Sequence, residues 1–414
     1  MSSLKLFLLL FLIGKLVMRL GLNLLNYLHL KHTAGQVPAA LTGVVEPSKL
    51  QQIDAYNAAK MIFQMVYILW DNLILLLFLF TPAYPLYSSW IDSLTLPLFL
   101  RGLLFFGIIA AGSWLIGLPF ACFFHFRIEE KFGFNRYTLW RWFGDELKNL
   151  LIDLIVLTII FWIVLAYWGN DLSFQWGRVW GAWLIALGLI VLFMYLVPVL
   201  VIPFFYRLKP VTDEGLRQKI IHLVENCGLK VSKVVEADES QKSAHANAQM
   251  AGIGRTKTII LFDTLIANYN ESEILAVLAH EIGHGKKRHL WIQIALAAVE
   301  FFLLIYFTAR LLSSSATFTA WDTSQVIYNG VFIAFIIFGE IMSFFVTPFS
   351  SYLSRKLEYE ADRFSKQVLQ SGAPLRGVFL KFIVNELDNI NPHPWYEAFY
   401  YSHPSLLKRI KALE

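Results

Sequence analysis

The sequence predicts an α-helical membrane protein with seven transmembrane helices and a small α/β portion at the cytoplasmic face. Three observations lead to this fold class: the composition, the spacing of long apolar stretches and the placement of positive charge. Of the 414 residues, 57% are hydrophobic and only 16% are charged. Soluble domains carry roughly 25% charged residues, so much of this surface does not need to face water. No lysine- or arginine-rich block resembles a nucleic-acid-binding arm, so we expect no nucleic-acid partner.

An α-helix needs ~20 residues to span a bilayer. The sequence contains seven apolar stretches of about that length. They lie at about 4–28, 60–82, 97–122, 149–168, 179–205, 290–313 and 326–348. The first contains Lys5, Lys15 and Arg19 and shares its basic start with signal peptides. Because no small-residue cleavage pair follows promptly, we interpret it as a retained helix. The second contains Asp71, which is expected to face the bundle interior or a water-filled cavity.

Positive charge alternates between the connections of these seven stretches. The connections near 83–96, 169–177 and 314–325 contain no lysine or arginine, whereas the intervening connections and the tail after 349 are basic. Because basic loops stay cytoplasmic, this pattern predicts an outside N-terminus and a cytoplasmic C-terminus. The membrane is then the inner membrane in a bacterium or the endoplasmic reticulum in a eukaryote.

The spans divide the chain into four parts. Residues 1–205 hold five transmembrane helices, 206–289 form the main cytoplasmic portion, 290–348 hold two more transmembrane helices, and 349–414 form a cytoplasmic C-terminal portion. In 206–289 a helix is expected to start at Thr212 or Asp213 and to stop at Gly228. Three strand-like runs follow, and glycines mark the turn between the last two. The runs are Lys233–Glu236, His245–Met250 and Thr256–Phe262, with Gly252 and Gly254 at that turn.

The next helix carries the residues that point to chemistry. Asn270 and Glu273 make a capping-box start for a helix over Glu271–Lys287. His280 and His284 then lie four residues apart on one face, where both imidazoles can reach one metal ion. The glutamate between them, Glu281, lies about 100° round the helix, where it can take a proton from water on the metal. Zinc suits such ligands and lowers the pKa of its water towards ~7. We therefore predict one catalytic Zn²⁺ per chain.

A third protein ligand must come from elsewhere in the chain. The extended zincin pattern requires glycine and histidine where this sequence has Lys287 and Leu290, and His289 is one residue out of register, so that variant is rejected. The remaining choice is a carboxylate on a later helix, as in sites with two histidines and a glutamate. Glu358 and Asp362 share one helical face after the seventh span.

We assign Glu358 as the third ligand and Asp362 as the acceptor that orients a ligand histidine. Glu360 points roughly 200° away from Glu358 and is interpreted as part of a solvated face neutralised by Arg355 and Lys356. Both halves of the proposed site lie within ~15 Å of the same membrane face, because His284 shortly precedes the sixth span and Glu358 shortly follows the seventh.

The chain resembles the type I CAAX prenyl proteases, which are seven-helix membrane zinc endopeptidases. The likeness covers most of the chain and includes the zinc helix together with several separate runs. These are Ile128–Asn135, Ser243–Ala248, Ile260–Leu265, Glu358–Asp362, and His403, Pro404 and Arg409 near the C-terminus.

This resemblance implies a water-filled chamber enclosed by the helices, with the zinc site at its cytoplasmic end. It also implies that Asn247, with His245 in the same run, lies on an edge strand that binds the substrate backbone by strand addition. His403 and Arg409 would lie near the metal and stabilise the oxyanion or contact substrate. The residues alone leave a helix cap open for His403 and a surface charge open for Arg409.

The resemblance further implies a peptide or protein substrate that carries a prenyl group, and membrane lipid as the surrounding partner. Two other functions remain open at this stage. A membrane quality-control zinc protease is the nearer one, although such proteins are expected to have fewer than five spans before the zinc helix. The other is a non-catalytic membrane protein with structural zinc, against which Glu281 and the open fourth ligand position argue.

Overall fold

The computed structural model describes residues 2–38, 41–169, 171–252 and 257–414. Seven helical segments in this part of the chain are long and apolar enough to cross a membrane. This confirms the predicted number of spans. The segments are α1 (Ser3–Thr33), α2 (Pro47–Phe80), α4 to α5 (Leu98–Phe132), α6 (Leu139–Trp168), α7 to α8 (Trp176–Phe205), α12 (His289–Leu312) and α14 (Ile327–Val368).

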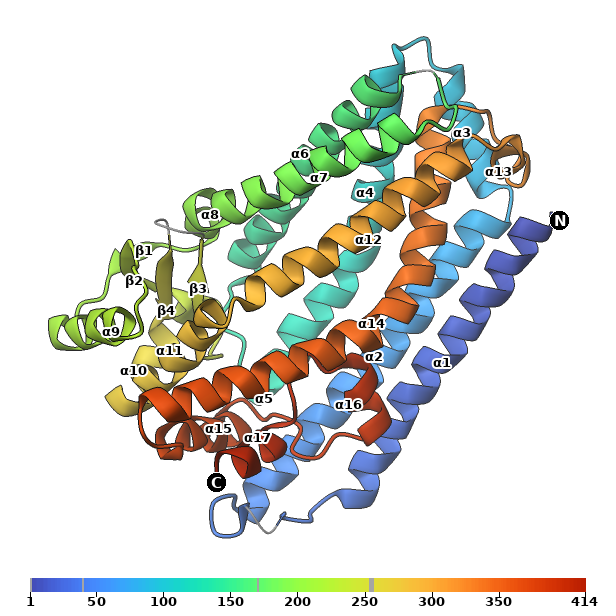
Figure 1. Ribbon diagram of the computed structural model, residues 1–414. Coiled ribbons are helices and arrows are strands. Elements are labelled where there is room, and N and C mark those ends of the chain that lie inside the picture. The colour runs from blue at the N-terminus through green and yellow to red at the C-terminus, as the bar shows by residue number, and fades with distance from the viewer. Residues whose placement is uncertain (1, 39–40, 170, 253–256) are drawn as a thin grey trace.

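Most of these helices extend well beyond the apolar stretches that predicted them. The second stretch was expected to begin near residue 60, yet α2 begins at Pro47, and α14 continues to Val368, 20 residues past the predicted end of the seventh span. Hydropathy locates the part of a helix that lies in lipid, whereas the helix itself continues wherever it finds packing partners. Pro348 lies inside α14, and the helix bends along its length (Figure 1), as prolines cause helices to do.

The membrane helices form an elongated bundle, with the sheet and the C-terminal helices at one end (Figure 1). Two short helices, α3 (Ala83–Ser93) and α13 (Ser315–Thr319), close the other end. A core of large side chains packs there, including Tyr84, Phe105 and Trp321, each with no exposed surface. Large apolar side chains elsewhere on the helices are exposed, such as Leu10 and Leu184, as expected for a surface that faces lipid.

A four-stranded sheet lies at the end of the bundle that carries the C-terminus (Figure 1). Its order is β1 (Leu208–Pro210), β2 (Lys233–Ala237), β4 (Thr258–Phe262) and β3 (Ala248–Ala251). The β2–β4 pair is parallel and the other two pairs are antiparallel, so β3 is an edge strand. The sequence predicted β2 and β4 but not β1, and the predicted turn residue Gly254 lies outside the described residues.

The third predicted strand begins later than expected. Strand β3 starts at Ala248 rather than at His245, because the backbone before it bonds to other elements. Ser243 bridges to Asn135, and the Ala246 N–H donates to the Glu386 carboxylate at 3.0 Å. The residues from 243 to 247 are therefore anchored in place before the strand begins.

Helices around the sheet begin where the capping residues predicted. Helix α9 (Glu214–Asn226) is capped by Asp213, whose carboxylate accepts from Leu216 N at 3.0 Å. Helix α11 (Glu271–Lys286) has the complete capping box of Asn270 and Glu273. Together with α15 (Ala373–Asn385) and α17 (Leu406–Leu413), these helices enclose the second apolar core, in which Ile220, Leu261, Ile383 and Ile410 are fully buried.

Candidate functional site

Close packing of α11 against α14 creates the site. A Cβ atom on Gly283 would lie 3.2 Å from the Ala361 Cα and 3.2 Å from the Phe364 Cβ, so only glycine fits at this crossing without displacing α14. The Ser365 hydroxyl also donates to the Ala276 carbonyl oxygen of α11 at 2.9 Å. Two segments that are more than 70 residues apart in sequence are thus held side by side.

At this crossing His280, His284 and Glu358 face one point. The two histidine Nε2 atoms lie 3.2 Å apart. His284 Nε2 lies 3.3 Å from Glu358 Oε1, and His280 Nε2 lies 3.4 Å from Glu358 Oε2. Ligand atoms on a tetrahedral zinc ion with bonds of about 2.0–2.1 Å are about 3.3–3.4 Å apart. The three side chains therefore have the mutual spacing of a zinc ligand set.

The chemistry of the donors also fits a bound cation. Glu358 Oε2 is buried and accepts no hydrogen bond of good geometry among the described residues, although His280 Nε2 and a terminal nitrogen of Arg409 lie 3.4 and 3.3 Å from it, so the oxygen can still bind a cation. His280, His284 and Glu358 offer two imidazole nitrogens and a carboxylate oxygen within 4.8 Å of one another. In the described part of the chain, they form the one group of histidine, cysteine or acidic residues that could hold a metal ion. The site therefore fits a borderline cation such as zinc and leaves a fourth position for water.

Glu281 follows His280 directly on α11. Its carboxyl group interacts electrostatically with His280, His284 and Glu358. Burial raises the pKa of the Glu281 carboxyl above its usual value, because the charged form loses hydration. A carboxylate with these neighbours is suited to accept a proton from a water molecule at the site.

Asp362 fixes the orientation of the His280 ring through its Nδ1 atom. Its Oδ1 lies 2.9 Å from His280 Nδ1, on the ring edge opposite the nitrogen that faces Glu358. Arg409 donates to Asp362 through Nε at 2.8 Å and through a terminal nitrogen at 2.6 Å, and the same terminal nitrogen lies 3.3 Å from Glu358 Oε2. Arg409 is only 6% exposed, so the surface-charge alternative for this residue is wrong.

A second outer contact, on His284, was missed in the sequence. His289 Nδ1 lies 2.9 Å from His284 Nδ1, and His289 Nε2 lies 3.4 Å from a carboxylate oxygen of Glu360. Glu360 was interpreted as part of a solvated face neutralised by Arg355 and Lys356; its side chain is 30% exposed and lies against His289. Arg355 does not neutralise it, because it donates to backbone carbonyl oxygens of α16 (Pro394–Tyr400) and Tyr401. The i, i+5 spacing of His284 and His289 gave no signal, because the chain turns between α11 and α12.

His403 lies on the open side of the site. Its Nε2 is 3.4 Å from Glu358 Oε1, while its side chain remains 62% exposed. The alternative of a helix cap is wrong, because α17 has Ser405 at its N-cap position. An exposed imidazole beside the metal ligands can donate a hydrogen bond to a bound substrate.

Strand β3 runs beside α11. A Cβ on Gly285 would lie 2.6 Å from the Met250 methyl group, which shows how closely the strand approaches the helix that carries the histidines. Asn247 is exposed and directly precedes β3, and its backbone oxygen accepts from Phe262 N at 3.2 Å. Strand β3 therefore has a free edge close to the helix that carries His280 and His284.

His245 holds the segment that leads into β3. Its Nε2 lies 3.1 Å from a Glu129 carboxylate oxygen, and its Nδ1 bonds to Glu386. Tyr56 donates to Glu129 at 2.6 Å, and the Phe134 ring stacks on the imidazole at 4.3 Å between centroids. Burial opposes protonation of His245, but the hydrogen bonds that its ring nitrogens donate to the two carboxylates outweigh burial and raise the pKa of His245 to about 9.

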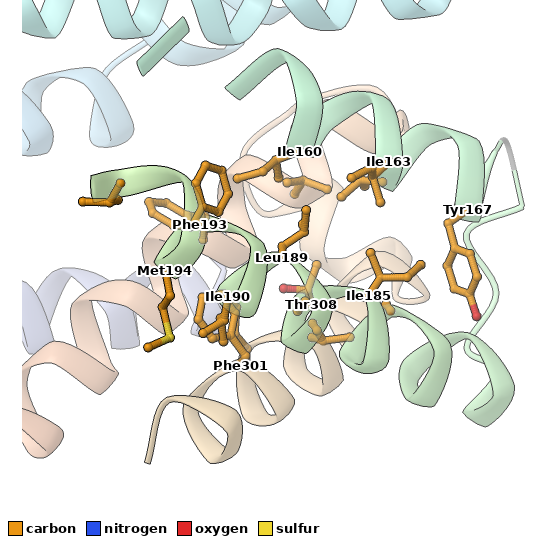
Figure 2. A pocket seen from close by; sticks show the side chains of 18 of the residues that line it. Ile160, Ile163, Tyr167, Ile185, Leu189, Ile190, Phe193, Met194, Phe301 and Thr308 are labelled. Carbon is orange, nitrogen blue, oxygen red and sulfur yellow. The ribbon is translucent and has the colours of Figure 1, made fainter. Parts of the chain in front are cut away.

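A large apolar cavity of about 750 Å³ adjoins the same strand. Its walls come from α6, α7, α12 and α14, with residues such as Ile163, Leu189 and Phe301 pointing into the space in Figure 2. Met250 and Ala251 of β3 form part of the lining, as does Leu290 in the first turn of α12. Apolar walls thus continue directly from the edge strand into the helix bundle.

Comparison with known families matches nearly the whole chain. Residues 26–207 match a family described as "CAAX prenyl protease N-terminal, five membrane helices". Residues 210–414 match "Peptidase family M48". The two matches meet at β1, just after the fifth membrane segment ends.

Individual proteins give the same result. The chain is 31% identical to the CAAX prenyl protease 1 homolog of Arabidopsis thaliana, over 91% of this chain and 90% of that protein. It is 29% identical to CAAX prenyl protease 1 of Saccharomyces cerevisiae, over 76% of this chain and 72% of that protein. The crystal structure of S. mikatae Ste24p superposes over 100% of both chains with a TM-score of 0.91 at 25% identity.

Proposed function

This protein belongs to peptidase family M48, in the branch formed by the CAAX prenyl protease 1 proteins, and on that premise we propose that it cleaves peptide bonds with one zinc ion held by His280, His284 and Glu358. It is a multi-pass membrane metallopeptidase. The observation that supports the zinc assignment is the convergence of two imidazole nitrogens on one carboxylate: the Nε2 atoms of His280 and His284 lie 3.2 Å apart, and each lies 3.3–3.4 Å from one oxygen of Glu358.

A zinc ion held by these residues would act as a Lewis acid that polarises the scissile carbonyl and lowers the pKa of a water molecule, so that a hydroxide-like nucleophile is available at neutral pH. The protein residues have separate tasks around it. Asp362 accepts a hydrogen bond from the Nδ1–H group of His280, which leaves Nε2 unprotonated and free to bind the metal. Arg409 contacts both Asp362 and Glu358, so we assign it the role of a positioning residue.

Glu281 acts as the general base and then as the general acid. It removes a proton from the attacking water as the water oxygen bonds to the scissile carbonyl carbon. The carbon–nitrogen bond then breaks, and Glu281 passes that proton to the departing amine. The products are a new carboxylate and a new amine. His403, exposed beside Glu358, is positioned to donate a hydrogen bond to the carbonyl oxygen as negative charge develops on it.

The substrate is proposed to be an extended peptide that carries a prenyl group. The free edge of β3, with Asn247 at its start, supports binding of the peptide backbone by strand addition. The adjoining apolar cavity of about 750 Å³ supports burial of a prenyl chain close to the cleaved bond. The relatives are named for CAAX prenyl substrates, and the apolar lining of the cavity makes the same class of substrate suitable here.

The orientation proposed for the protein follows from its charges. The basic connections and the tail after 349 support a cytoplasmic site and C-terminus, with the N-terminus outside. In Figure 1 the termini lie at opposite ends of the bundle, as seven spans require. The same four parts, 1–205, 206–289, 290–348 and 349–414, are retained as the proposed domain organisation.

The two other functions are not favoured. A quality-control protease with fewer membrane helices does not account for the match of residues 26–207 to a five-helix N-terminal region. A non-catalytic protein with structural zinc does not account for membership in a peptidase family.

Purified protein in lipid nanodiscs tests the proposal with a farnesylated CAAX peptide and its unmodified counterpart. We expect zinc-dependent cleavage that a chelator stops and added zinc restores, with the farnesylated peptide strongly preferred. Equal cleavage of both peptides would contradict the prenyl preference while leaving the peptidase assignment intact. A metal-loaded protein that cleaves neither peptide would contradict the whole proposal.

A further inference from the structure

A second large groove lies between α2 and the helix run from α4 to α5, with a volume of about 850 Å³. One wall is a stripe on α2 at positions 59, 62, 63 and 66, and the other runs from Pro119 to Phe132 on the facing helix. None of the metal ligands lines this groove, and neither does any residue of strand β3.

The apolar part of the groove is aromatic. The Phe63 ring centroid lies 6.3 Å from Phe120 and 6.1 Å from Phe123. At one end of the groove the ring centroids of Trp70 and Phe120 lie 5.8 Å apart. At the opposite end those of Tyr56 and Phe132 lie 5.0 Å apart. The two helices are therefore antiparallel along the groove, and residues beyond 123 lie at the end nearer the sheet portion.

Two cations line the groove at that same end. Arg127 and Lys131 are both exposed, and no ion pair or hydrogen bond involves either side chain within the described residues; the Lys131 ammonium lies 5.5 Å from the neighbouring Phe132 ring centroid. The acids next to them in sequence are engaged elsewhere. Glu129 bonds to Tyr56 and His245, and Glu130 accepts from Asn135 at 2.7 Å.

We propose that this groove binds one phospholipid with an anionic headgroup. Its acyl chains would lie against Phe63, Phe120 and Phe123, and its phosphate between Arg127 and Lys131. An apolar channel between membrane helices that ends in two unneutralised cations is complementary to such a lipid in both shape and charge. The guanidinium of Arg127 can hold two phosphate oxygens at once, while Lys131 adds a second charge.

The position along the membrane agrees with this occupant. The cations lie in a connection that the charge pattern assigns to the cytoplasmic side, where anionic lipids are concentrated. In Figure 1, α5 lies towards the end of the bundle that carries α15 and α17. A lipid with its phosphate at this level would extend its chains along α2 and α4 into the hydrocarbon layer.

The full-length protein tests the proposal, with bound lipids counted by native mass spectrometry and by the shift in unfolding temperature. Phosphatidylglycerol is compared with phosphatidylcholine of the same chains. Two cations near a membrane surface predict roughly thirtyfold tighter binding of phosphatidylglycerol. The double variant R127Q/K131Q is expected to abolish this preference. The matched control K230Q/K233Q, which removes two exposed lysines near the sheet, is expected to keep it.

A variant that narrows the groove separates bound lipid from general surface attraction. Ala59 lines the apolar part, so Ala59→Trp fills the space that the chains need while keeping both cations. We expect it to lose phosphatidylglycerol binding, with its unfolding temperature in phosphatidylcholine unchanged as the folding check. Glycerol 3-phosphate, which has the charge but no chains, is expected not to compete.

Three results would overturn the proposal: equal binding of the two lipids, equal losses in the R127Q/K131Q and K230Q/K233Q variants, or full phosphatidylglycerol binding by a folded Ala59→Trp variant. The last result would indicate that the cations attract the membrane surface without a lipid in the groove.

Discussion

His289 Nδ1 lies 2.9 Å from Nδ1 of His284, on the ring edge opposite the nitrogen that faces Glu358. The metal ligand is thereby connected through His289 to the Glu360 carboxylate. Partners of this kind fix the tautomer and orientation of a ligand histidine, and their loss typically costs 10–100-fold in metal affinity. We expect His289→Phe to weaken zinc binding by about that factor, measured by competition with a chelator. Unchanged affinity would show that His289 only fills space.

Asp362 has the same relationship to His280 and also neutralises Arg409. In Asp362→Asn the amide can still accept a hydrogen bond, but the buried Arg409 loses its shorter ion pair and keeps only the contact with Glu358 at 3.3 Å. We expect metal affinity to fall by about 10–100-fold and thermal stability to fall as well, because a buried charge loses its closest partner. Asp322→Asn, in a connection at the other end of the molecule, is the control for removal of one carboxylate.

Glu281→Gln keeps the size of the side chain and removes the base. Peptidase turnover is expected to fall by about 10²–10⁴-fold, the usual contribution of a general base. Zinc content should remain at one per chain, because Glu281 is not among the three grouped ligands. Single-turnover cleavage assays and elemental analysis of the same sample check both statements. A fully active, zinc-loaded variant would show that another group takes the proton.

Gly283 sets the distance between α11 and α14. A larger side chain meets the Ala361 backbone, which cannot rotate away, so Gly283→Leu is expected to separate the helices. Overpacking of this kind typically costs about 1–3 kcal/mol of stability, and here it also moves Glu358 away from the histidines. We expect lower unfolding temperature and loss of bound zinc. Gly339→Leu is the matched control, since a Cβ there has open space on α14.

The His245 cluster predicts a pH dependence of stability. The pKa of the His245 imidazole is raised to about 9 in the folded protein, against about 6.5 in an unfolded chain. The folded state then binds more protons, so the stabilisation is complete below about pH 6.5 and is lost as the pH rises through about 9. Unfolding temperature should fall across this window in the native protein. The fall should be smaller in His245→Gln, while His222→Gln, an exposed histidine on α9, should behave like the native protein.

Local chemistry made much of the fold predictable. Membrane insertion depends on the apolarity of single segments, and capping depends on neighbouring side chains, so the seven spans and the caps at Asp213 and Asn270 could be read directly from the sequence. The pair His280 and His284 is local in the same sense. Assigning Glu358 required only that its helix and α11 meet at one membrane face.

Contacts between distant elements were not predictable in this way. Strand β1 has three residues and no periodic pattern, so only its pairing with β2 identifies it. Glu129 and Glu386 each look like surface acids in the sequence, and only the fold brings them to His245. Glu360 was misread for a related reason, because its partner His289 lies on another helix.

The long helix α14 has a consequence for how this enzyme can exist. It has 42 residues and would be ~63 Å long if straight, about twice the ~30 Å hydrocarbon thickness. One part is solvated by lipid, and the other carries Glu358 and Asp362. Because α14 is continuous between these two parts, the position of Glu358 relative to the histidines is coupled to the tilt of the lipid-embedded part. A bilayer thinner or thicker than the native one is therefore expected to change the rate of hydrolysis by the tilt that it imposes on this helix.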